Sequence, residues 1–128
     1  SLWVANSEIT ITNSTFKQSY EGRHIVQEAS VVPSYSGNTF EDGFAAIGVI
    51  GTVSGDVTWP VREVPYMITR RYSSNNSTIS VNSNSTLTLD PGVTVQFEYD
   101  SNSSEKGYMN VSGSLIDING FSVRIGCF

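Results

Sequence analysis

Acidic side chains are the residues of this chain whose type and spacing suit chemistry on a polysaccharide. Glu98 and Asp100 stand one residue apart at the end of an alternating stretch, which places both on one face of a strand. Two carboxylates can act as acid and base at a glycosidic bond, or share a calcium ion. The other acids considered for this role are Glu41, Asp42, Asp90 and Asp117.

The requirements of that chemistry argue against catalysis. Hydrolysis needs two carboxyl groups about 5–10 Å apart, and elimination from a uronate needs a basic Arg or Lys. The repeat described below places Arg124 at the position of Gln96, 28 residues earlier, so we expect Arg124 to form a salt link with Glu98 and Asp100. We interpret the two acids as solvated residues that end a strand. We expect no catalytic or metal-ligating residue and no cofactor, with calcium as the alternative.

Other catalytic constellations are missing from the sequence. His24 is the only histidine and no Ser-x-Gly elbow or cysteine lies near it in the sequence, which argues against a Ser-His-Asp triad and a zinc site. Cys127 is the only cysteine, so an intrachain disulfide is excluded. We interpret His24 as a solvated loop residue.

Tyrosines provide the second kind of candidate ligand contact, because exposed rings can stack on sugar faces. Two polar segments without periodicity, residues 71–76 and 99–106, are predicted to be loops, which often carry binding residues. Tyr72 and Tyr99 belong to these segments. The predicted ligand-binding residues are therefore Tyr72, Tyr99, Glu98 and Asp100.

The elements that must position these side chains are organised around residues 87–97, Leu-Thr-Leu-Asp-Pro-Gly-Val-Thr-Val-Gln-Phe. Alternation predicts two short strands, each with one buried face. Pro91 presets its backbone angle, and Gly92 is expected to adopt the positive φ of a tight corner.

Similar strands recur along the chain at nearly constant spacing. Met109 follows Ile79 by 30 residues, Leu115 follows Leu87 by 28, and Val123 follows Val95 by 28. Such spacing is typical of stacked coils, in which equivalent side chains lie over each other in one bore. We therefore predict that these three pairs are stacked in parallel.

The amino-acid sequences of these strands also resemble those of a known family. The phrases STLTLDPGVTVQFE and YMNVSGSLIDING, preceded by Trp59 and PYMIT, resemble extracellular surface proteins with a right-handed parallel β-helix of the pectate-lyase-like superfold. The resemblance covers residues 59–125. It implies an all-β scaffold and transfers no catalytic residue. A β-sandwich is the alternative fold, because alternating strands with turns suit it too.

The N-terminal half reads as shorter coils of the same kind. Thr15-Phe16 is echoed 24 residues later by Thr39-Phe40, and a buried strand is predicted within residues 46–50. In each echo a nearby Asn is expected to stack on the Asn of the next coil. We predict one β-helical domain, with N-terminal coils in residues 1–58 and C-terminal coils in residues 59–128. It is expected to be a fragment or subunit whose apolar ends are covered by another chain or by missing coils.

Composition restricts the partners. The net charge of −5 offers no basic stripe for nucleic acid, and no apolar run is long enough to span a membrane. Only 15 % of residues are charged, while Ser, Thr and Asn are abundant, which indicates an extracellular or cell-surface protein. Asn-x-Ser/Thr sequons, candidate glycosylation sites, occur at Asn13, Asn75, Asn76, Asn84, Asn102 and Asn110.

The sequence therefore predicts a non-catalytic extracellular module that is structural, adhesive or carbohydrate-binding. Its expected partner is a polysaccharide or a cell-surface glycan. Two alternatives stay open: part of a carbohydrate-active enzyme, either a polysaccharide lyase or a glycosidase, and a subunit of an extracellular filament or sheath.

Overall fold

The computed structural model describes residues 2–17, 23–41, 45–69, 78–98, 107–117 and 122–126. Within these ranges the chain is all-β, without a helix, and therefore without a helix that could cross a membrane. The strands are β1 (Leu2–Val4), β2 (Thr10–Thr12), β3 (Thr15–Phe16), β4 (Ile25–Glu28), β5 (Ser34–Ser36), β6 (Thr39–Phe40), β7 (Ile47–Val53), β8 (Asp56–Trp59), β9 (Tyr66–Ile68), β10 (Thr78–Val81), β11 (Thr86–Leu89), β12 (Thr94–Glu98), β13 (Tyr108–Val111), β14 (Ser114–Asp117) and β15 (Ser122–Gly126).

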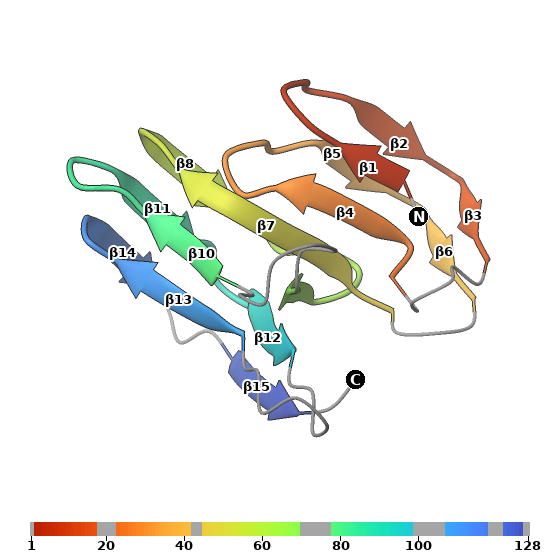
Figure 1. Ribbon diagram of the computed structural model, residues 1–128. Helices are drawn as coiled ribbons and strands as arrows, with labels where there is room; N and C mark the ends of the chain where they lie inside the picture. Colours follow the sequence, from red (N-terminus) through yellow and green to blue (C-terminus); the bar gives the residue numbers. More distant parts are fainter. Residues whose placement is uncertain are drawn as a thin grey trace.

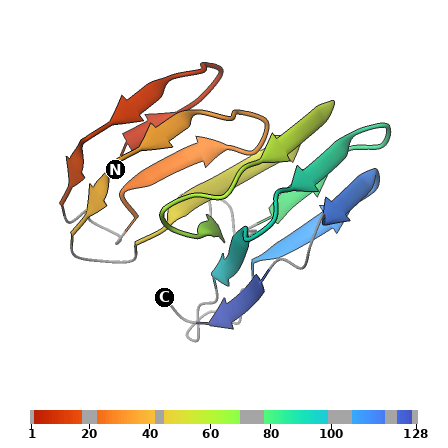
Figure 2. The ribbon, with the colours of Figure 1, turned by 180° about the vertical axis from the view of Figure 1, so that it is seen from behind.

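Every pairing between the described strands is parallel. The largest sheet has the order β1-β4-β7-β9-β12-β15, and β10 joins it by pairing with β7 and β13. The smaller sheets are β8-β11-β14, β2-β5 and β3-β6. Figures 1 and 2 show the layers following one another from the red N-terminal strands to the blue C-terminal ones. Parallel pairing throughout is not the antiparallel pairing of a β-sandwich.

The predicted register is confirmed. Ile79 is the partner of Met109, Leu87 of Leu115 and Val95 of Val123. The shorter repeat holds as well, since Thr15 pairs with Thr39 and Phe16 with Phe40. Equivalent positions of successive layers thus lie one strand spacing apart, about 4.8 Å.

The core consists of the inward positions of these strands. In β11, Leu87 and Leu89 are fully buried while the alternate residues Thr86 and Thr88 are half-exposed, as alternation requires. Trp59 is also fully buried, stacks on Tyr66 with ring centroids 4.9 Å apart, and donates its indole N–H to the carbonyl of Ala29. Burying a large apolar side chain contributes roughly 1.5–3 kcal/mol to the free energy of unfolding, so the Trp59–Tyr66 pair stabilises the packing of the middle layers.

The Pro91-Gly92 corner forms as predicted. Gly92 has φ +86°, and the amide of Val93 donates to the carbonyl of Asp90 at 3.1 Å, which closes the turn. A residue with a Cβ rarely adopts this φ, which is why glycine stands here.

The predicted Asn-on-Asn stacking near the N-terminal corners is wrong. Because Thr15 pairs with Thr39, Asn38 lies at the position of Ser14 rather than of Asn13. The Oδ1 of Asn38 accepts a hydrogen bond from the Ser14 backbone N–H at 3.0 Å, and its Nδ2 donates one to the Ile11 carbonyl oxygen at 2.8 Å. One side chain therefore satisfies two backbone groups of the neighbouring layer.

Strands at both ends of the described stack keep one open edge. β1, β2 and β3 pair on one side only, as do β13, β14 and β15. Large apolar side chains are exposed on these strands at Leu2, Trp3, Tyr108, Val111, Leu115 and Ile116. That another chain or further coils cover these edges stays a prediction.

Candidate functional site

Of the predicted ligand-binding residues, only Glu98 lies in the described part of the chain; Tyr72, Tyr99 and Asp100 lie outside it. Glu98 is not the solvated residue expected at a strand end. It is 8 % exposed, its carboxylate pairs with the Arg23 guanidinium, and the Thr69 hydroxyl donates to its other oxygen at 2.7 Å. A carboxylate held this way is a structural group, because burial without such partners would be very costly.

The expected salt link to Arg124 is only partly tested. The register prediction holds, since Gln96 and Arg124 are strand partners. The side chain of Arg124 lies outside the described side chains. Glu98 instead has Arg23 as a partner, which alternation along one strand could not indicate.

His24 also differs from the prediction of a solvated loop residue. It is 2 % exposed, and its ring packs edge-on against Phe16 and Phe40, with centroids 6.4 and 5.6 Å away. Its Nε2 lies 2.9 Å from the carbonyl oxygen of Glu41. The two phenylalanines stack on each other at 5.2 Å, so His24 belongs to a small aromatic cluster.

The remaining predicted acids do not converge. Glu41 forms an exposed ion pair with Lys17 at 3.6 Å, and Asp42 lies outside the described residues. Asp90 belongs to the Pro91-Gly92 corner, and Asp117 ends β14. Among the described residues, no three metal-ligating side chains of the His, Cys, Asp or Glu type come together.

The sequons fall into two groups. Asn13, Asn84 and Asn110 are exposed, and the first two have positive φ in corners. Asn75, Asn76 and Asn102 lie outside the described residues, as does Cys127.

Two of the hollows on the described surface differ in how their polar groups are used, and the Arg62, Glu63 and Tyr66 side chains of the smaller one already have hydrogen-bond partners. It has a volume of about 150 Å³ and is lined in part by Arg62, Glu63 and Tyr66. Arg62 donates to the Tyr66 hydroxyl at 3.1 Å and lies 4.9 Å from the Tyr35 ring centre. Glu63 accepts the amides of Gly37 and Asn38 at 2.6 and 3.1 Å. Its polar groups therefore hold the fold.

The larger hollow, of about 330 Å³, is the candidate ligand groove. It is lined by Asn6, Ser7, Glu8, Ser30, Val31, Val32, Asp56, Val57 and Thr58. Residues before β2 and β5 line one part of it and β8 lines another, and these strands belong to sheets that do not pair with each other. The groove thus lies where strand pairing is interrupted.

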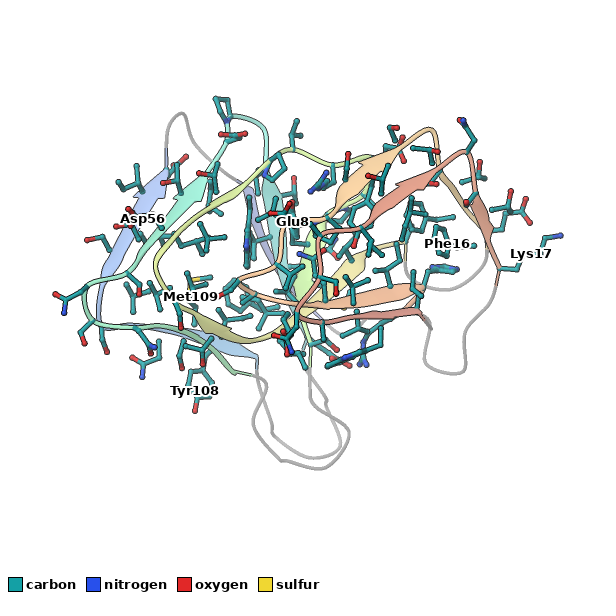
Figure 3. The ribbon with its side chains drawn as sticks, turned by 90° about the horizontal axis from the view of Figure 1, so that it is seen from above. Glu8, Phe16, Lys17, Asp56, Tyr108 and Met109 are labelled. Atoms are coloured by element: carbon teal, nitrogen blue, oxygen red, sulfur yellow. The ribbon has the colours of Figure 1, made fainter. Side chains whose placement is uncertain are left out.

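Polar side chains of this groove are available to a ligand. Glu8 and Asp56 come from separate parts of the chain (Figure 3). Neither carboxylate has a hydrogen bond or ion pair with a described residue. The hydroxyls of Ser7 and Thr58 are likewise uncommitted. Ser30 is different, because its hydroxyl donates to Thr52 and accepts the Ser54 amide.

Valines supply the apolar part of the same surface. Val31 and Val57 are 9 % and 8 % exposed, and Val32 is half-buried. Apolar contacts surrounded by a few free polar groups are the usual make-up of a small-ligand site. The arrangement is suited to a sugar, whose C–H face is apolar and whose edge carries hydroxyls.

The sequence interpretation missed this groove. Asp56 stands at the outward start of β8 and Glu8 precedes β2, and nothing in their local sequence distinguishes them from other surface acids. The groove depends on β5 and β8 not pairing, which is a property of the folded chain. Comparison of the chain with family models, with curated proteins and with solved structures finds no match.

Proposed function

We propose that this chain is part of a right-handed parallel β-helix in a secreted or surface-displayed protein, and that it binds a glycan without catalysis. The β-helix is supported by parallel pairing of strands that return after a nearly constant number of residues, such as Leu87 with Leu115 and Val95 with Val123. The extracellular setting is supported by the low proportion of charged residues, 15 %.

The observation that carries glycan binding is the groove between β2-β5 and β8-β11-β14. It combines valine side chains with the free hydroxyls of Ser7 and Thr58 and the free carboxylates of Glu8 and Asp56. Carboxylates and hydroxyls accept and donate hydrogen bonds to sugar hydroxyls, and the valines exclude water below the ring.

A matched pair of substitutions tests this proposal. Thr58 and Thr88 are strand partners at equivalent outward positions, but only Thr58 lines the groove. Glycan array screening of the full chain is expected to give oligosaccharide ligands, whose affinities are then measured by calorimetry. Thr58→Leu should weaken binding about five- to tenfold, because it removes a hydrogen-bonding group and adds bulk, while Thr88→Leu should not. Equal affinities for both variants, or no ligand at all, would refute the proposal.

A second candidate function is glycoside hydrolysis, and the specific observation in its favour is the presence of two uncommitted carboxylates in one groove. An acid and a base or nucleophile are the minimum for that reaction. Incubation of the full chain with each bound oligosaccharide distinguishes the two functions. Cleavage products that disappear in both Glu8→Gln and Asp56→Asn would establish hydrolysis, and an unchanged oligosaccharide supports binding alone.

A further inference from the structure

The charge of the groove leads to an inference about which class of glycan it binds. This inference rests on the proposed function. Glu8 and Asp56 place two carboxylates on it, and neither has a cationic partner among the described residues. Glu28 lies next to it, where its carboxylate accepts the Asn6 amide at 3.2 Å. The groove and its border are therefore acidic.

Cations whose side chains the structure describes are committed elsewhere. Lys17 pairs with Glu41, and Arg23 pairs with Glu98. Arg62 lines the other hollow, where it contacts Tyr66 and Tyr35. None of these three side chains lines the groove, so the charge of Glu8 and Asp56 is left for a ligand to balance.

We propose that the groove prefers a glycan bearing protonated amino groups, such as an oligomer of 2-amino-2-deoxyglucose, and rejects uronate glycans. Amines of different sugars along the oligomer would donate charge-assisted hydrogen bonds to the carboxylate of Glu8 and to that of Asp56. The hydroxyls beside these amines would meet Ser7 and Thr58, and the apolar ring faces of the sugars would meet the valines. A uronate would bring a third negative charge into the groove, and like charges repel.

A plain cationic peptide fits the groove less well than an amino sugar. A lysine side chain carries one charge on a flexible stem and has no hydroxyls with which to use Ser7 and Thr58. The preference is thus expected to combine charge with sugar shape.

The experiment measures binding of the full chain to five probes at a mildly acidic pH, where an ordinary carboxyl group is ionised and a sugar amine is protonated. The probes are glucosamine oligomers, their N-acetylated equivalents of the same length, neutral gluco-oligomers, galacturonate oligomers and tetralysine. Glucosamine oligomers should bind most tightly and weaken with added salt, and galacturonate oligomers should not bind.

Isosteric substitutions locate the effect. Glu8→Gln and Asp56→Asn should each weaken glucosamine-oligomer binding by about three- to fivefold, the range of an exposed ion pair. Glu41→Gln, which removes a charge outside the groove, should leave it unchanged. Circular dichroism and melting curves establish that each variant is folded.

Three outcomes contradict the inference in different ways. Neutral or N-acetylated oligomers that bind as tightly as the cationic ones would overturn the amine preference but leave the proposed glycan binding intact. Tetralysine that binds as tightly as the glucosamine oligomers would reduce the effect to charge attraction and overturn the preference for sugar. Absence of binding to every oligosaccharide would refute the proposed function itself.

Discussion

The carboxylate of Glu98 joins the guanidinium of Arg23, a residue 75 positions earlier in the chain, and both side chains are about 10 % exposed. The pair connects Arg23, two residues before β4, to Glu98, the last residue of β12, and these two strands are separated in the sheet by β7 and β9. It therefore links N-terminal layers to C-terminal layers through side chains alone.

Breaking this ion pair should destabilise the protein. Glu98→Gln keeps the shape of the side chain but removes a buried negative charge beside the Arg23 guanidinium, for which we expect a loss of about 3 kcal/mol in the free energy of unfolding. Urea unfolding measures the loss, and Glu41→Gln, which breaks the exposed pair with Lys17, is the control with a change below about 1 kcal/mol. Equal stability of the two variants would show that the Glu98 pair is not structural. Since Glu98 does not line the groove, Glu98→Gln should leave the glycan binding proposed above unchanged.

Gly92 should tolerate Asn better than Val. A Cβ at this position would lie 3.7 Å from Val61, an ordinary contact, so the cost of substitution comes from the backbone φ of +86° rather than from a clash. Gly92→Val is expected to cost on the order of 1–3 kcal/mol, and Gly92→Asn less, because Asn enters the left-handed region more readily. Thermal melting of both variants provides the measurement. Identical melting curves for wild type and Gly92→Val would be incompatible with the turn.

The two interlayer hydrogen bonds of the Asn38 side chain should contribute to the stability of the fold. Asn38→Ala leaves the Ser14 amide and the Ile11 carbonyl without their partner, at a cost of about 1–3 kcal/mol. Asn38→Asp preserves the acceptor for Ser14 but places a carboxylate oxygen against the Ile11 carbonyl oxygen, and since the two repel, it should lose more than the alanine variant. The reverse order in chemical unfolding would contradict the assigned roles of the two amide atoms.

Alkaline pH should weaken the fold through two tyrosines. Burial raises the pKa of Tyr35 and of Tyr66 from 10.0 to about 12, against the opposing effect of Arg62. Below pH 10 both states hold the phenol protons, and between pH 10 and 12 the unfolded chain releases them first. The free energy of unfolding should therefore fall in this window, by at most about 1.4 kcal/mol per pH unit for each tyrosine.

Phenylalanine variants test the origin of that decline. Tyr35→Phe and Tyr66→Phe each remove one phenol, so the slope of unfolding free energy against pH should become shallower in each variant. Tyr108→Phe, at an exposed position, is the control and should keep the wild-type slope. A slope that is the same in all four proteins would assign the decline to other groups.

Local patterns predicted the parts of the fold that depend on local chemistry. The strands around Leu87 and Val95 and the positive φ of Gly92 follow from alternation and turn preference, and the register follows from constant spacing. The predictions that were wrong concern the solvent exposure of individual polar residues. Glu98 was expected in solvent as the end of a strand and His24 as a loop residue, yet Glu98 is buried against Arg23 and His24 against Phe16, residues of other strands or layers.

The candidate groove lay beyond sequence reasoning for a related reason. Alternation indicates which side chains of a strand point outwards, but it does not say whether one strand pairs with the next layer. Because β5 and β8 belong to different sheets, Glu8 and Asp56 come to line one hollow. This absence of pairing leaves no signature in either segment.

The double pairing of β7 bears on how the molecule comes apart. Residues Ile47–Val49 of β7 pair with β9, whereas residues Gly51–Val53 pair with β10, so one continuous strand serves two neighbours. Neither neighbour can detach without exposing backbone groups of β7, and stacked layers would otherwise be free to fray one at a time. The amides of β9 and β10 should consequently exchange hydrogen through one shared opening event. That event is the detachment of β7, after which both β9 and β10 lose a strand partner and can unfold.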